Sequence, residues 1–81
     1  ETKFTFELSS EAEVSIMVYT LGGKKIKNFD SKIYQPGFHY IKWNGRNEYG
    51  KLLSNGMYIY KIKAENIYSK THQMKKLAIS R

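Results

Sequence analysis

The stretch Met57-Tyr58-Ile59-Tyr60-Lys61-Ile62-Lys63-Ala64-Glu65 has the strongest strand pattern in the chain. Successive side chains of a strand point to opposite faces, so alternate residues belong together. One face is aromatic or aliphatic (Tyr58, Tyr60, Ile62, Ala64), and the opposite face is charged (Lys61, Lys63, Glu65). This alternation predicts a half-buried strand, and the preceding Ser54-Asn55-Gly56 predicts a turn.

The same two-residue period recurs along the rest of the chain. It predicts further strands around residues 3–8, 14–19, 25–34, 38–43 and 72–80. Gly22-Gly23, Pro36-Gly37 and Asn44-Gly45 separate these strands, because glycine accepts the positive φ of tight turns. Residues 28–31 break the alternation and predict a bulge. Leu52-Leu53 is too short for a full strand and predicts an edge piece.

Six or seven short strands, with turn signals at roughly 8–12-residue intervals, are typical of a β-sandwich or a small barrel. No segment has a convincing helical period. We therefore predict an all-β fold, an immunoglobulin-like or fibronectin type III-like antiparallel sandwich. Its core is expected to contain Ile16, Trp43, Tyr58 and Tyr60, with glycines at the turns: Gly23, Gly37, Gly45 and Gly56.

The length of 81 residues allows one domain, 1–81, with a modest core. There is no cysteine, which excludes disulfides and thiolate metal sites. No apolar run approaches the roughly 18 residues that suggest a membrane span. The chain starts at Glu1 without a methionine or a signal peptide, so we expect it to be one module, most naturally the C-terminal one, of a larger protein.

The net charge of +7 comes from twelve lysines and two arginines against seven acids. A basic surface attracts anionic partners, but a solvated, lysine-rich exterior explains the charge more simply. Lys24, Lys25 and Lys27 form one candidate basic patch, and Lys75, Lys76 and Arg81 form another. Nucleic-acid binding would combine such charges with stacking aromatics on one face. We therefore predict no nucleic-acid partner.

Reactive or metal-binding constellations are not visible in the sequence. The serines lie outside any nucleophile-elbow pattern, and the acids are scattered along strands and turns. His39 and His72 lack the convergent partners that a zinc site requires. Asn44, Asn47 and Glu48 supply one carboxylate where calcium usually takes several, so we expect them to close their loop by hydrogen bonds. We predict no catalysis, no metal and no cofactor.

Four tyrosines are candidates for a binding face: Tyr34, Tyr40, Tyr49 and Tyr68. Exposed tyrosines stack on sugar rings and offer hydroxyl hydrogen bonds. Tyr40 and Tyr49 are the residues that we would assign to glycan contact. The alternative is that the tyrosines cover the edge of the core with hydrated hydroxyls.

These residues together resemble the immunoglobulin-like domain named after the flagellar hook-capping protein (FlgD). The segment from Trp43 to Ile62 resembles that family's pattern W-[DN]-G-x-[DN]-x-x-G-x-x-x-x-S-G-x-Y-x-Y-x-[LI]. Val14–Gly23 resembles its first hairpin, Pro36–Trp43 its central strand and Lys75–Ile79 its last strand. Asn44, where the family usually has Asp, and Asn55, where it has a small residue, depart from the pattern without threatening the fold.

The resemblance implies a non-catalytic module near the C-terminus of a secreted or surface bacterial protein, whose parent can be a hydrolase or peptidase. The family is similar to the C-terminal sorting domains of type IX secretion cargo. Export, anchoring or domain spacing is therefore the expected role, with neighbouring domains, secretion machinery or cell-surface polysaccharide as partners. Two alternatives stay open: a carbohydrate-binding accessory module of a glycoside hydrolase, and the hook-cap domain itself.

Overall fold

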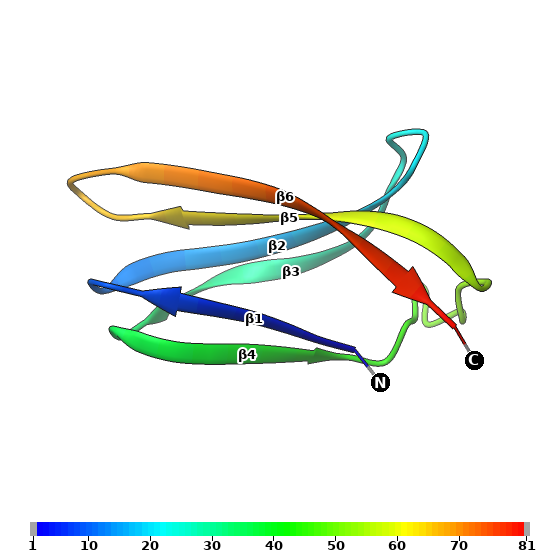
Figure 1. The fold of residues 1–81 in the computed structure, drawn as a ribbon, viewed down its shortest axis with the longest axis horizontal. Helices are drawn as coiled ribbons and strands as arrows, with labels where there is room; N and C mark the ends of the chain where they lie inside the picture. The colour runs from blue at the N-terminus through cyan, green and yellow to red at the C-terminus, as the bar shows by residue number, and fades with distance from the viewer. Residues whose placement is uncertain (1, 81) are drawn as a thin grey trace.

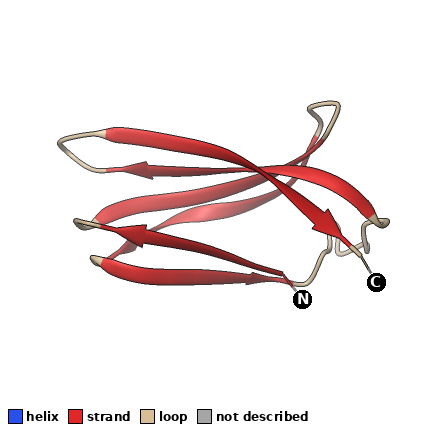
Figure 2. Ribbon diagram, viewed as in Figure 1, coloured by secondary structure: helices blue, strands red, loops and turns tan. Residues whose placement is uncertain are grey.

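The computed structural model describes residues 2–80, and every regular element in that range is a β-strand (Figures 1 and 2). All strand pairs are antiparallel. This confirms the predicted all-β sandwich. The strands are β1 (Thr2–Leu8), β2 (Ala12–Thr20), β3 (Lys25–Tyr34), β4 (Gly37–Trp43), β5 (Gly56–Glu65) and β6 (Lys70–Ile79).

The strands form two sheets of unequal width. One sheet has four strands in the order β3-β2-β5-β6, and the other pairs β1 with β4. In Figure 1 the two-stranded sheet lies beneath the wider one. The narrower sheet can cover only part of the inner face of the wider sheet.

The β2–β3 hairpin follows from its two glycines. Gly23 has a φ of 96°, a conformation that side chains with a Cβ rarely adopt. The turn is closed by the amide of Gly23, which donates to the carbonyl of Thr20 over 3.0 Å. Further along, Val14 pairs with Lys32 while Ile16 pairs with Phe29, so the register shifts within residues 29–32. This irregularity lies where the sequence predicted a bulge.

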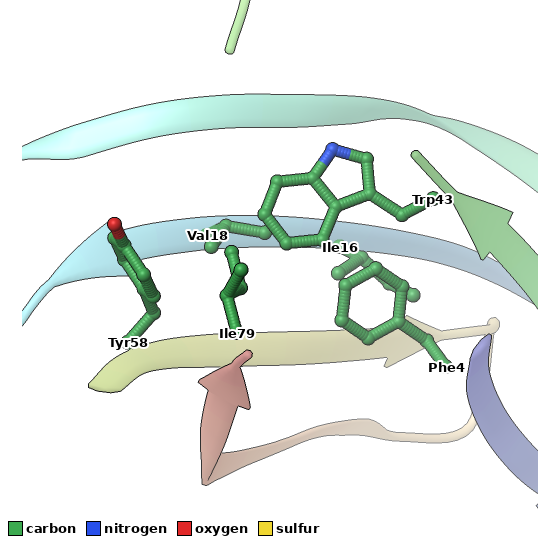
Figure 3. Close-up of a cluster of buried hydrophobic side chains, with 6 residues drawn as sticks. All are labelled: Phe4, Ile16, Val18, Trp43, Tyr58 and Ile79. Atoms are coloured by element: carbon green, nitrogen blue, oxygen red, sulfur yellow. The ribbon is translucent and has the colours of Figure 1, made fainter. Parts of the chain in front are cut away.

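The core is a cluster of six buried side chains contributed by both sheets, drawn in Figure 3. Phe4 stacks on Trp43 with ring centroids 5.8 Å apart, and Tyr60 approaches Phe4 at 4.8 Å. Each fully buried side chain of this kind stabilises the fold by about 1.5–3 kcal/mol. The six residues are Phe4, Ile16, Val18, Trp43, Tyr58 and Ile79.

The start of the last strand differs in detail from the sequence expectation. The last strand begins at Lys70, two residues before the expected His72. The reason is Asn66, whose side-chain oxygen accepts hydrogen bonds from the amides of Tyr68 and Ser69 and tightens the turn. Leu52 makes an isolated bridge with Arg46, which matches the predicted edge piece.

Candidate functional site

The loop between β4 and β5 follows Trp43, the last residue of β4. Trp43 is also the first residue of the longest segment that resembles the family pattern. The Trp43 side chain is buried, and its indole N–H donates to the carbonyl of Arg46 over 2.9 Å. Asn44 folds back so that its side-chain oxygen accepts from the amide of Arg46 at 3.1 Å. The loop is therefore anchored to the core by its first residues.

Asn47 organises the far part of the same loop. Its side-chain oxygen accepts from the amides of Tyr49 at 2.9 Å and Lys51 at 3.0 Å. The guanidinium of Arg46 donates to the carbonyl of Gly50 over 2.8 Å. These bonds satisfy backbone groups that would otherwise lack partners, and they hold the turn in one conformation.

Glu48 joins this loop to the edge of β3. Its amide donates to the carbonyl of Ile26 over 3.1 Å, and its carboxylate accepts a hydrogen bond from the amide of Asn28. An exposed sheet edge is prone to pairing with other chains, and a covering loop prevents this. The loop therefore protects one edge of the four-stranded sheet.

The chemistry of the loop is accordingly structural. Side-chain oxygens of Asn44 and Asn47 accept backbone hydrogen bonds within the loop, as the sequence predicted, whereas the Glu48 carboxylate accepts one from β3. Within residues 2–80 no group of three or more His, Cys, Asp or Glu side chains is placed to hold a metal ion. His39 instead stacks on Phe6 at 5.5 Å and lies 2.6 Å from the carbonyl of Gln35.

The residues assigned to core and turns occupy the following places. Ile16, Trp43 and Tyr58 are buried, and the Tyr58 hydroxyl donates to the carbonyl of Ser54 over 2.7 Å. Tyr60 is half-buried against the same cluster. All four selected glycines have positive φ values: Gly23, Gly37, Gly45 and Gly56.

The four candidate tyrosines do not form one strip. Tyr40 is 55% exposed on β4 and Tyr49 is 92% exposed in the β4–β5 loop. Tyr34, in contrast, packs edge-on against Phe6, and Tyr68 belongs to the β5–β6 loop at the opposite end from Tyr49 (Figure 1). Tyr40 and Tyr49, the two residues assigned to glycan contact, are both exposed but lie on separate elements.

The basic residues are also divided. Lys75 pairs with Tyr60 on the inner face of the wide sheet, whereas Lys76 pairs with Ile59 on its outer face. Lys24, Lys25 and Lys27 lie on the β2–β3 hairpin and on β3. Arg81 lies outside the described residues. The lysines at the end of the chain therefore do not make the single patch that their spacing suggested.

Sequence reasoning missed two surface features. A hollow of about 410 Å³ at the end with the β5–β6 loop is lined by the exposed Ile33, Ile67 and Tyr68, with three glutamates around it: Glu11, Glu13 and Glu65. A second hollow runs along β1. The only sequence signal for the first is the pair Ile67-Tyr68, which places two large apolar residues in an otherwise polar turn.

A comparison with known protein families agrees with the Ig-like sandwich described above. Residues 1–67 match the family model described as the FlgD Ig-like domain. The chain belongs to the FlgD Ig-like domain family. This membership identifies the chain as a structural, non-enzymatic Ig-like domain. The match spans β1 to β5, and therefore includes the Trp43 loop and every strand of the core except β6.

A solved structure supports the same fold. The crystal structure of FlgD from P. aeruginosa superposes on this Ig-like domain with a TM-score of 0.77 at 17% sequence identity. The match covers 94% of this chain and 60% of that chain, so the domain spans less than two thirds of that FlgD chain. None of the curated protein sequences matches this chain. Residues 2–80 contain no helix long and apolar enough to cross a membrane.

Proposed function

We propose that this Ig-like domain is a non-catalytic structural and interaction module of a larger secreted or cell-surface bacterial protein. Its role there is export, surface anchoring or domain spacing. The most specific version of this proposal is export through a type IX secretion system. The observation that carries the proposal is the Trp43 loop. The polar side chains that could have formed a reactive centre instead brace the loop against its own backbone and β3.

The arrangement of the ends supports a role in presentation. β1 begins and β6 ends at one end of the molecule, while the β1–β2, β3–β4 and β5–β6 loops meet at the other (Figure 1). A domain attached to a parent protein through one end leaves the opposite end free. That free end contains the exposed Ile33, Ile67 and Tyr68.

Localisation of the parent protein in its own cells tests this proposal. An antibody raised against the 81-residue chain should detect a protein in the medium or on intact cells, where added protease removes the signal. Detection only inside the cell would refute the proposal. Exchange of the domain for an unrelated Ig sandwich of equal length separates the roles, because spacing would survive the exchange and export would be lost.

A second candidate is a domain of a flagellar hook-capping protein. Both the family model and the solved structure carry the FlgD name, which favours this candidate. Deletion of the domain from the parent gene should then abolish hook assembly and motility. Normal hooks in the deletion strain would eliminate it.

A carbohydrate-binding accessory module is a third reading, favoured by the exposure of Tyr40 and Tyr49 alone. Lys3 lies over the Tyr40 ring, with its ammonium 5.0 Å from the centroid, and so occupies part of the surface that a sugar would use. The export and presentation role accounts for more of the structure.

A further inference from the structure

Several strands lie at the edges of the two sheets, and β1 is the edge strand that borders a groove. β1 pairs with β4 on one side, and among residues 2–80 no other strand pairs with it. The opposite edge of β1 therefore presents unpaired backbone N–H and C=O groups. Such an edge is a template for another extended chain.

The inner face of β6 above this edge is uncovered. Residues Thr71, Gln73 and Lys75 pair with the inner-face residues of β5, yet all three are exposed. On the same face further along β6, Leu77 is half-buried and Ile79 is buried. Because a sandwich normally covers the inner faces of its sheets, one half of β6 lacks the strand that would lie beneath it.

A groove lies beneath β6 at the position where this strand is missing. It has a volume of about 240 Å³ and is lined by β1 from Thr5 to Leu8, by Ile62 and Ala64, and by the three exposed residues of β6. A second hollow of about 180 Å³ shares Glu7 and Leu8 and extends the groove towards Ser10. The two hollows follow the open edge of β1 along half of its length.

The occupant that fits this geometry is a single extended polypeptide segment. Only a strand satisfies a row of backbone donors and acceptors, and apolar side chains on alternate positions would cover Phe6 and Ile62. Two-fold pairing of β1 with a second copy is disfavoured. It would bring the overhanging β6 strands of both copies into the same space above the paired edges.

The charges of β1 set the register of that segment. Lys3, Thr5 and Glu7 are exposed on the outer face, and they alternate with the inward Phe4 and Phe6. Every ladder in the domain is antiparallel. A complementary antiparallel strand places a base opposite Glu7, an acid opposite Lys3 and small apolar residues inward.

We propose that the open edge of β1 and the groove beneath β6 bind one extended peptide segment in antiparallel register, with a base opposite Glu7 and an acid opposite Lys3. This names a partner chemistry for the interaction module proposed above. The test needs only the isolated chain and no knowledge of localisation, so failure here and failure of the export proposal are distinguishable.

The probe is the capped heptapeptide Thr-Lys-Val-Thr-Val-Glu-Thr, titrated into the isotope-labelled 81-residue chain by NMR. We expect saturable shifts of the β1 amides and of the amides around Gln73, with millimolar affinity. The peptide with proline in place of the central threonine lacks one backbone donor and should not bind. The charge-exchanged peptide, Thr-Glu-Val-Thr-Val-Lys-Thr, should bind about tenfold more weakly.

The double variant K3E/E7K is the matched control on the protein, because both side chains are exposed and the net charge is unchanged. It should reverse the preference between the two charged peptides. Absence of saturable β1 shifts, or equal binding of the proline peptide, overturns the proposal. Unchanged peptide preference in the double variant overturns the register. Concentration-dependent β1 shifts without peptide would show self-pairing and overturn the choice of occupant.

Discussion

Replacement of Trp43 by alanine should be among the most destabilising single changes in this domain. The side chain is 3% exposed, stacks on Phe4 at 5.8 Å and donates its N–H to Arg46. Truncation of a buried tryptophan costs about 3–5 kcal/mol, from lost transfer energy and the cavity left behind. An 81-residue domain has a stability of roughly 4–12 kcal/mol, so Trp43→Ala removes about a quarter of it or more.

Urea unfolding measures this loss. We follow it by far-UV circular dichroism instead of fluorescence, because Trp43 is the only tryptophan and the substitution removes it. In a thermal melt, at roughly 4–8 °C per kcal/mol, we expect the midpoint to fall by about 12–40 °C. Trp43→Phe keeps an aromatic ring beside Phe4 but loses the N–H donor, and should cost about 1–2 kcal/mol.

The control for Trp43→Ala is Tyr49→Ala, a large aromatic truncation at a 92% exposed loop position. We expect it to change stability by less than about 0.5 kcal/mol. If Trp43→Ala and Tyr49→Ala unfold at the same urea concentration, Trp43 is not packed between the sheets and the description of the core is incorrect.

Three other changes test separate parts of the structure. Asn47→Ala removes two loop hydrogen bonds and should cost about 1–2 kcal/mol in urea unfolding; an unchanged midpoint would show that the loop is held by other contacts. Gly23→Ala meets no atom within 4 Å but must adopt a φ of 96°, so a loss of about 1 kcal/mol from backbone strain is expected, and a gain would contradict the turn geometry. For the glycan alternative, calorimetric titration with soluble polysaccharides should show no binding; millimolar binding lost on Tyr40→Ala or Tyr49→Ala would reverse our preference.

The fold was readable from the sequence because nearly every strand carries its own alternation. Val14, Ile16 and Val18 on β2 and Tyr58 on β5 are all buried on the face that the period assigns to them. Asn66 shows where this reasoning stops. Its side chain caps two amides of the β5–β6 turn, and this local chemistry moved the start of β6 without leaving any trace in the hydrophobic pattern.

The Trp43 loop was predictable as a structural feature but not in its full role. Asparagines in a turn predict side-chain hydrogen bonds to nearby amides, and Asn44 and Asn47 make them. The contact of Glu48 with β3 joins residues twenty positions apart, and no local pattern encodes it. The same limit applies to the tyrosines, because strand alternation gives a face but not the position of one element relative to another.

The β1 groove arises from a property that no single strand carries, the difference in width between the two sheets. On β6, the polar run of Thr71, Gln73 and Lys75 on the inner face breaks the expected apolar alternation, and the sequence alone offers no reason for it. With the sheets in place the reason is clear, because these residues have no strand beneath them and remain in water. Lys75 is an inward-pointing charge on the edge strand β6. Inward charges on edge strands disfavour unwanted strand pairing. A strand that enters this groove must therefore match the charges of β1 as well as its backbone, and this makes the edge selective for particular segments instead of generally adhesive.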